Sequence, residues 1–187
     1  MLYEIRWHGR GGQGAITAAQ ILAEAAYYHH ELYVTASPSF GAERRGAPIT
    51  ASTRIADEKI RLRSQIVNPD IVIVLDETLL KDVDVTAGLK PGGLIILNTN
   101  KEPKEVKLKG SFRRVTADAT KVALDLDLRA AGLLVTNTTI LGAVVKATDI
   151  GITLEDVQDI IKRHFPGEAG EKNAEAAKKT YDITIME

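Results

Sequence analysis

Residues 2–14 read LYEIRWHGRGGQG, and this stretch decides the expected fold. Leu2 to Trp7 predicts a short strand, and Gly9 to Gly14 predicts a glycine-rich turn. Ala15 to His30 then carries apolar residues at helical spacing. A strand, a tight turn and a helix in this order indicate the opening β–turn–α unit of an α/β domain.

Further strands and one long loop follow this unit. A second strand is expected at Leu32 to Ala36, and it leads into the loop Ser37 to Pro48. Two unbroken apolar runs, Ile71 to Leu75 and Leu94 to Leu97, are typical of strands covered on both faces of a parallel sheet. Phe112 to Val115 is a shorter candidate strand.

A hairpin and four more helices complete the expected architecture. Alternating hydrophobicity predicts hairpin strands at Ile49 to Ile55 and Lys59 to Arg63. Helical spacing is found in four segments: Ala117 to Arg129, Asn137 to Thr148, Leu154 to His164 and Glu171 to Tyr181. We therefore expect residues 1–187 to form a single α/β domain, a three-layer Rossmann-like sandwich. Its sheet should be mostly parallel with one β-hairpin, and its helices should gather toward the C-terminus.

Composition excludes several classes of function. The net charge of -1 gives no overall attraction to nucleic acid. The chain has no cysteine, which excludes disulfides, cysteine-ligated iron–sulfur clusters and thiol nucleophiles within it. No apolar stretch approaches the roughly 20 residues of a membrane span, and no metal-ligand cluster has the usual spacing. We expect a cytoplasmic protein that binds neither nucleic acid nor membrane.

The glycine-rich turn is the first candidate binding site. It matches the pattern G-x-G-x-x-G after a strand and before a helix, with Gly9, Arg10, Gly11, Gly12, Gln13 and Gly14. Glycines let a phosphate approach the backbone, and the helix N-terminus supplies N–H groups. The alternative is a tight turn that packs helix against strand without a ligand. No carboxylate ends the second strand at Val34 to Ser37, so NAD binding loses support.

The loop after the second strand is the other candidate. Its candidate ligand-binding residues are Ser39, Phe40, Gly41, Glu43, Arg44 and Arg45. Loops at the carboxyl ends of strands lie near one another, so this loop should face the glycine turn. The paired arginines could grip phosphate or carboxylate, or they could be a solvated surface pair. We expect Arg54, Lys59, Arg61 and Arg63 to form a solvated hairpin face or part of a partner-binding surface.

Other polar residues carry weaker signals. His8 could contact a ligand or simply end the first strand, and Asp76-Glu77 is more typical of a helix start than of catalysis. His29-His30 suits the end of a helix and lacks the spacing of a metal pair. No nucleophile, base and orienting group come together, so we assign no catalytic residue to this chain.

Two stretches resemble the gamma subunits of pyruvate and related 2-oxoacid:ferredoxin oxidoreductases. They are EIRWHGRGGQG, residues 4–14, and PSFGAERRGAP, residues 38–48. The resemblance continues through Asn68-Pro69-Asp70, residues 89–93, Asn137-Thr138, Leu141-Gly142-Ala143, Asn173, Ala177 and Tyr181. It covers nearly the whole chain. The paired arginines are more similar to the pyruvate and branched-chain group than to the 2-oxoglutarate group.

The resemblance implies an assembly that reversibly converts pyruvate, coenzyme A and oxidised ferredoxin to acetyl-CoA, carbon dioxide and reduced ferredoxin. It implies alpha, beta and delta subunits, or fused equivalents, as partners. Thiamine diphosphate is then expected between alpha and beta, and iron–sulfur clusters in beta and delta. The gamma part is associated with coenzyme A binding. Two alternatives stay open: an NAD- or FAD-binding oxidoreductase, and a purely structural subunit whose loops bind neighbouring chains.

Overall fold

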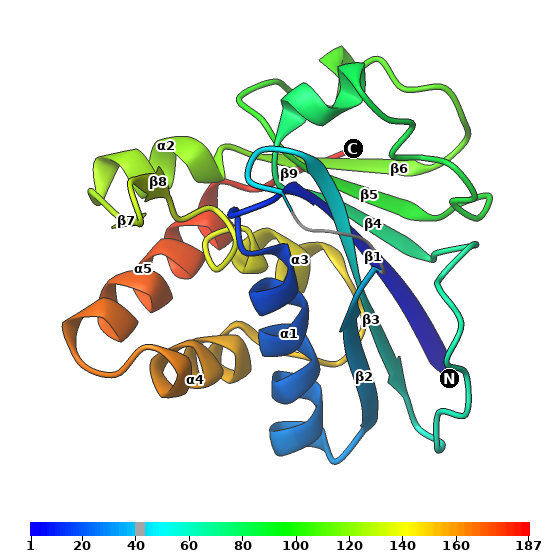
Figure 1. The fold of residues 1–187 in the computed structure, drawn as a ribbon, viewed down its shortest axis with the longest axis horizontal. Helices are drawn as coiled ribbons and strands as arrows, with labels where there is room; N and C mark the ends of the chain where they lie inside the picture. The colour runs from blue at the N-terminus through cyan, green and yellow to red at the C-terminus, as the bar shows by residue number, and fades with distance from the viewer. Residues whose placement is uncertain (40–43) are drawn as a thin grey trace.

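The computed structural model describes residues 1–39 and 44–187, and a seven-stranded sheet lies at its centre (Figure 1). The strand order is β2-β3-β1-β4-β5-β6-β9. The bounds are β1 (Leu2–Arg10), β2 (Tyr33–Pro38), β3 (Pro48–Ala56), β4 (Ile71–Val74), β5 (Leu94–Asn98), β6 (Arg113–Ala117) and β9 (Ile185–Met186).

The sheet is mixed, and most of its strands run in one direction. Strands β1, β4, β5 and β6 pair in parallel, whereas β3 is antiparallel to both β1 and β2, and β9 is antiparallel to β6. Only β3 and β9 therefore oppose the direction of the other described strands of this sheet. This arrangement confirms the expected α/β fold with a mostly parallel sheet.

Helices cover one face of the sheet (Figure 1). They are α1 (Ala15–His30), α3 (Leu141–Ala147), α4 (Leu154–His164) and α5 (Glu168–Ile183). Helix α2 (Ala119–Asp125) and the small hairpin of β7 (Arg129–Ala130) and β8 (Leu133–Leu134) extend beyond them. The bounds expected for α1 and α4 are confirmed. Helix α3 begins later than expected, because a turn in which Ile140 N–H bonds Thr136 O precedes it.

The opposite face of the sheet, which we call the outer face, has two unlike halves. Under β4 and β5 it is apolar, with Val72, Val74, Ile95 and Leu97 buried in a second core. The 3-10 turns η1 (Glu77–Lys81) and η2 (Pro103–Glu105), with their connecting segments, form this thin third layer. Under β1, β2 and β3 the same face carries polar side chains.

The expected hairpin partner of Ile49 to Ile55 is wrong. Lys59 to Arg63 contains no strand, and β3 pairs instead with β1 over nine residues and with β2. The hairpin of the sheet is therefore β2–β3. Arg54 is also buried rather than solvated. Its charge is paired in the buried position, because its Nε donates to Glu4 Oε1 at 2.8 Å. Alternation within a segment could not reveal which other strand it pairs with.

Trp7 joins the first three elements of the fold. The side chain is fully buried, and its Nε1 donates to Thr53 Oγ1 of β3 at 3.0 Å. Thr53 Oγ1 in turn donates to Ala19 O of α1 at 3.0 Å. This buried chain of hydrogen bonds fixes β1, β3 and α1 relative to one another.

Candidate functional site

The candidate site begins where the chain leaves β1 and enters α1. The backbone takes positive φ at Gly12 (90°) and Gly14 (78°), a conformation that glycine adopts without a Cβ penalty. Gly14 is the N-cap of α1, without a side-chain cap, and no acidic residue lies in the first turn of the helix. The positive end of this helix dipole therefore meets no carboxylate of its own first turn.

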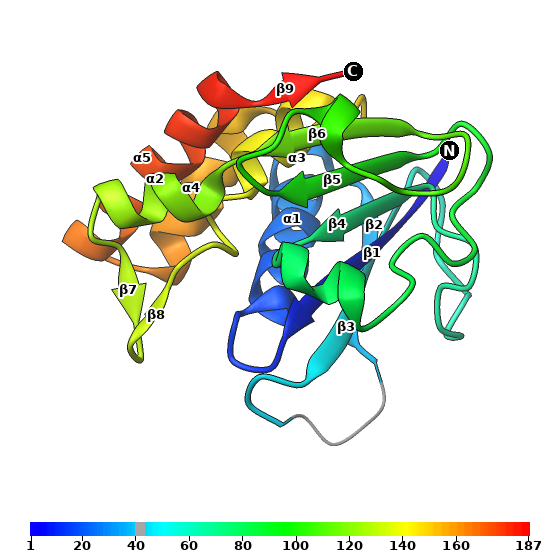
Figure 2. The same ribbon diagram turned by 90° about the horizontal axis from the view of Figure 1, so that it is seen from above.

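Residues 44–47 of the second candidate loop lie beside the glycine-rich turn, as the topology predicted (Figure 2). Gly11 N–H donates to Ala47 O at 2.8 Å, and Gly46 N–H donates to Gly11 O at 3.0 Å. A Cβ at Gly11 would lie 2.1 Å from Arg44 O, so close approach of the two backbones requires this glycine. We call this arrangement the glycine edge, comprising residues 9–14 and 44–47.

The exposed arginines of the second loop lie at this edge. Arg44 and Arg45 are both exposed, and Arg45 Nη2 donates to Ala131 O at 3.4 Å. Of the other candidates in the loop, Ser39 bonds Thr50, whereas Phe40, Gly41 and Glu43 lie outside the described residues. The edge thus places two exposed cations beside the start of α1.

Arg10 is directed at η1 instead of toward open solvent. Its guanidinium donates to Asp82 Oδ2 at 2.6 Å and to Thr78 Oγ1 at 2.8 Å. It also lies 3.4 Å from Asp76 Oδ2. The hydrogen bond to Asp82 raises the pKa of Arg10 above its ordinary value. Arg10 therefore ties the glycine edge to η1, and the structure gives its guanidinium protein partners in place of a ligand.

Gln13 and Asp76 extend this network. Gln13 Oε1 accepts from Arg10 N–H at 2.7 Å, and its Nε2 donates to Asp76 Oδ2 at 2.8 Å. Burial raises the pKa of Asp76, but the hydrogen bonds from Thr78 and Gln13 outweigh this and hold it below its ordinary value. Asp76 also caps η1 through Thr78 N, which confirms the helix-start interpretation.

Strand β2, whose end was expected to carry any ribose-binding carboxylate, is not adjacent to β1 in the sheet. The parallel neighbour of β1 is β4, and the carboxylate that follows β4 is Asp76, which accepts a hydrogen bond from Gln13 of the glycine edge. The strand that comes second in sequence, β2, lies at the far edge of the sheet. Both oxygens of Asp76 already accept hydrogen bonds from the protein. A carboxylate after β4 therefore does not restore support for NAD binding.

A cleft of about 880 Å³ opens beside the glycine edge, at the carboxyl ends of β4 and β5. Gln13 and Asn98 lie in its wall, and Asn98 Nδ2 donates to Leu75 O and to Thr120 Oγ1, each at 2.9 Å. The charged residues of the wall are Asp76, Glu77, Asp118, Asp125, Lys121 and Arg129. Carboxylates outnumber cations here, so the interior of the cleft suits neutral groups better than phosphates.

Asn137, in the turn before α3, supports the glycine edge through a contact that no sequence motif indicated. Asn137 Nδ2 donates to Gly14 O at 3.2 Å, and a Cβ at Gly14 would lie 2.4 Å from the same nitrogen. The neighbouring Thr138 donates to Asn173 Oδ1 of α5 at 2.6 Å within the core. Only the family resemblance singled out Asn137-Thr138 and Asn173 in the sequence, and in the structure they position the glycine-rich turn.

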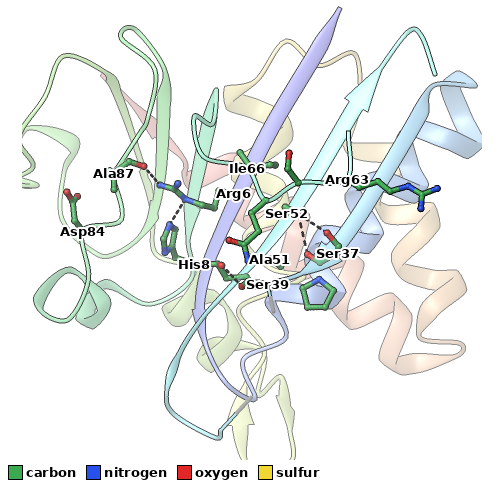
Figure 3. A pocket seen from close by; sticks show the side chains of 14 residues that line it. Arg6, His8, Ser37, Ser39, Ala51, Ser52, Arg63, Ile66, Asp84 and Ala87 are labelled. Atoms are coloured by element: carbon green, nitrogen blue, oxygen red, sulfur yellow. Dashed lines mark hydrogen bonds between the residues drawn. The ribbon is translucent and has the colours of Figure 1, made fainter. Parts of the chain in front are cut away.

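The histidines do not form a metal site. His29 and His30 contact Asp159 and Asp156 of α4, at 2.9 and 2.7 Å. Within residues 1–39 and 44–187, no group of three or more potential ligands could hold a metal ion. None of the described helices is long and apolar enough to cross a membrane. His8 directly precedes the glycine edge in β1, but its side chain lines a cavity of the outer face, the outer-face cavity (Figure 3).

Family, sequence and structure comparisons all point to the same group of oxidoreductases. The family description "Pyruvate ferredoxin/flavodoxin oxidoreductase" matches residues 4–183. The pyruvate/ketoisovalerate oxidoreductases common subunit gamma of Thermococcus litoralis is 54% identical over 99% of this chain and 98% of that protein. The crystal structure of a pyruvate oxidoreductase subunit PORC from Thermotoga maritima has a TM-score of 0.85, with 39% identity over 99% of this chain and 98% of the other.

A more distant structure shares the fold. It is a 2-oxoglutarate:ferredoxin oxidoreductase from Magnetococcus marinus, solved with 2-oxoglutarate, coenzyme A and succinyl-CoA bound. The TM-score is 0.75 with 22% identity, and the match covers 97% of this chain and 31% of that chain. At this identity the likeness shows the fold alone.

Proposed function

This chain belongs to the pyruvate ferredoxin/flavodoxin oxidoreductase family, as a gamma subunit of a 2-oxoacid:ferredoxin oxidoreductase, and we propose that its glycine edge binds the phosphate groups of coenzyme A. The observation that carries the proposal is the pairing of Gly11 with the Arg44–Ala47 segment. That pairing brings two exposed arginines to the start of α1, where helix N–H groups and the dipole attract anions.

The rest of the coenzyme would extend away from this charge. The neighbouring cleft is rich in carboxylates, but several already have partners: Asp125 with Lys121, Glu77 with Lys101 and Asp76 with Gln13. Such a wall accepts the neutral parts of the molecule and repels its phosphates. We therefore assign the phosphates to the helix start and the arginines, and the uncharged parts to the cleft.

The reaction itself requires other subunits. Because this chain has no cysteine, iron–sulfur clusters ligated by cysteine must be held elsewhere in the assembly. We propose alpha, beta and delta subunits as partners, with thiamine diphosphate between alpha and beta and with ferredoxin as electron acceptor, all working in the cytoplasm. Support for this arrangement comes from family membership.

The test replaces Arg45 in the assembled enzyme. Loss of one charged hydrogen bond to phosphate should weaken coenzyme A binding by about 1.5 to 3 kcal/mol, measured through its KM, with little change in the KM for the 2-oxoacid. Arg45→Lys should recover part of the loss. Arg61→Ala removes another exposed arginine away from the edge and serves as the matched control.

Gel filtration of the same variants separates ligand binding from docking. If Arg45→Ala loosens the complex while the remaining assembled enzyme keeps a normal KM for coenzyme A, the edge is a docking surface. The structural alternative would then replace the proposal, because close packing alone explains Gly11 and Gly14.

A further inference from the structure

Lysines of the thin third layer differ from lysines of the helices in their partners. On α5, Lys178 Nζ lies 3.1 Å from Asp182 Oδ2, and Lys179 Nζ lies 3.1 Å from Glu175 Oε1. The third layer also has exposed lysines that form no ion pair with any residue the structure describes: Lys81, Lys104, Lys107 and Lys109. We call these residues the lysine surface.

A groove of about 460 Å³ lies between two parts of this layer. Residues 80–86 form one wall, which carries Lys81, and residues 107–109 form the other, which carries Lys107 and Lys109. The apolar residues of the lining belong to the second core or pack against it: Leu80, Val83, Val85 and Leu108. The groove therefore combines an apolar lining with lysines on both walls.

The acidic residues of the groove do not neutralise these lysines. Asp82 Oδ2 accepts from Arg10 Nη2 at 2.6 Å, so an arginine from the glycine edge balances its charge. Asp84 Oδ1 accepts from Thr86 N–H at 3.0 Å and from Thr86 Oγ1 at 2.7 Å, and it forms no ion pair with the described lysines. A single unbalanced carboxylate therefore remains against the lysines of the lining, and the groove attracts negative charge.

The segment that carries Lys107 and Lys109 is held by the rest of the chain. Leu108 is half-buried against the second core, and its carbonyl oxygen accepts from Arg114 Nη2 at 3.1 Å. Arg114 Nη1 in turn donates to Glu187 Oε2 at 3.2 Å. A segment that is already ordered loses less conformational entropy on binding. The two lysines are therefore exposed on a backbone that a partner does not have to order.

We propose that the lysine surface docks an acidic segment of another subunit of the oxidoreductase, with carboxylates on the lysines and apolar side chains in the groove. The chain is a gamma subunit, so partner chains are expected. The proposal rests on that assignment and not on coenzyme binding at the glycine edge. Opposite charges across an interface steer the encounter of two chains and fix their register.

A polypeptide suits this groove better than a phosphate ligand does. The lining, as far as the structure describes it, contains neither arginine nor glycine. Forked arginine donors and glycine turns are common means of phosphate binding, and both occur at the glycine edge instead. Lysines beside an apolar lining fit a segment in which acidic and apolar side chains alternate.

Charge reversal in the holoenzyme, reconstituted from purified subunits, tests the docking. Lys107→Glu combined with Lys109→Glu should weaken association of this subunit about tenfold or more at low salt, because like charges then face each other. Gel filtration at decreasing protein concentration measures the dissociation. Association of the unaltered subunit should also weaken as sodium chloride rises from about 50 to about 500 mM, and the double variant should lose most of this dependence.

The matched control is Lys178→Glu combined with Lys179→Glu. It changes the net charge by the same amount, but on α5, which covers the opposite face of the sheet (Figure 1). The control should leave association unchanged. Lys107→Ala combined with Lys109→Ala removes the charges without adding repulsion, so its loss of affinity should be smaller. Circular dichroism of each variant shows that it is folded.

Carbodiimide cross-linking of the holoenzyme identifies the partner, because this reagent joins a lysine amine to a carboxylate in contact with it. Mass spectrometry should find Lys107 or Lys109 linked to an aspartate or glutamate of another subunit. Normal association of the folded Lys107→Glu, Lys109→Glu variant, or an equal loss in the control, would overturn the proposal. Normal association with a raised KM for ferredoxin would also overturn it, and would assign the lysine surface to the electron acceptor. The KM for coenzyme A of Arg45→Ala bears only on the glycine edge, so the two proposals fail separately.

Discussion

The glycine edge and the outer-face cavity differ in how their polar groups are used. At the edge, Arg10, Gln13 and the Gly11 backbone all bond other parts of the chain. In the cavity, the neutral ring of His8 accepts from Arg6 Nε through Nε2 and keeps its proton on Nδ1. The glycine motif therefore marks a segment whose polar groups mostly bond the rest of the chain. No motif marks the cavity, where a buried histidine N–H has no acceptor among the described residues.

The largest loss of stability that we predict follows from a substitution in the glycine edge. Gly11→Val places a Cβ 2.1 Å from Arg44 O, so the paired backbones must separate. We expect the free energy of unfolding to fall by about 3 kcal/mol or more, measured by urea denaturation with circular dichroism. In the assembled enzyme, the KM for coenzyme A should rise as the arginines move away.

Gly46→Ala is the control for this change. Gly46 has a φ of 81°, but an added Cβ would meet no atom within 4 Å. Only backbone strain should appear, costing roughly 1–2 kcal/mol. If both variants lose the same stability, close approach is not what requires glycine at position 11.

The next largest effect concerns pH and the cavity. The pKa of His8 is about 4 in the folded protein, below its ordinary 6.5, so unfolding takes up a proton between these values. The stability from this group is complete above pH 6.5 and is lost as pH falls toward 4. His8→Gln should remove about 2 kcal/mol of the loss seen between pH 7 and pH 5. Identical pH profiles for the two proteins would show that the folded histidine titrates normally.

The smallest predicted effect tests the network behind the edge. Gln13→Ala removes the hydrogen bonds from Arg10 N and to Asp76 Oδ2. We expect a loss of about 1 kcal/mol in the free energy of unfolding, since a typical intramolecular hydrogen bond contributes that much. The pKa of Asp76, followed by carboxyl NMR, should rise. An unaltered pKa would mean that Thr78 and Arg10 are sufficient to hold the carboxylate ionised.

Local sequence signals predicted much of the fold. Apolar spacing located α1 and α4 at their observed bounds, and the unbroken runs located β4 and β5. Pairing was harder to predict, because Lys59 to Arg63 alternates like a strand yet pairs with none of the strands in the described part of the chain. The antiparallel insertion of β3 between β1 and β2 depends on contacts that are distant in sequence.

The sequence predicted the location of the candidate site, but it did not predict the contacts of the individual side chains there. The switch-point rule correctly placed the two loops together. The end of the second strand in sequence is the wrong place for a ribose-binding carboxylate, because β2 is not adjacent to β1 and the parallel neighbour of β1 is β4. Nothing in the sequence indicated that Arg10 would bind η1, since Asp82 lies 72 positions away. The place of His8 in the outer-face cavity depends on its position opposite Thr50, and only the sheet shows this register.

The buried indole of Trp7 gives this subunit an optical reporter. It is the single tryptophan of the chain, and its side chain faces the helices while His8 faces the cavity. A fully buried indole emits at shorter wavelength than one in water, so its fluorescence follows the union of β1, β3 and α1 with no added dye. Refolding after dilution from denaturant can thus be timed at this junction in the native sequence.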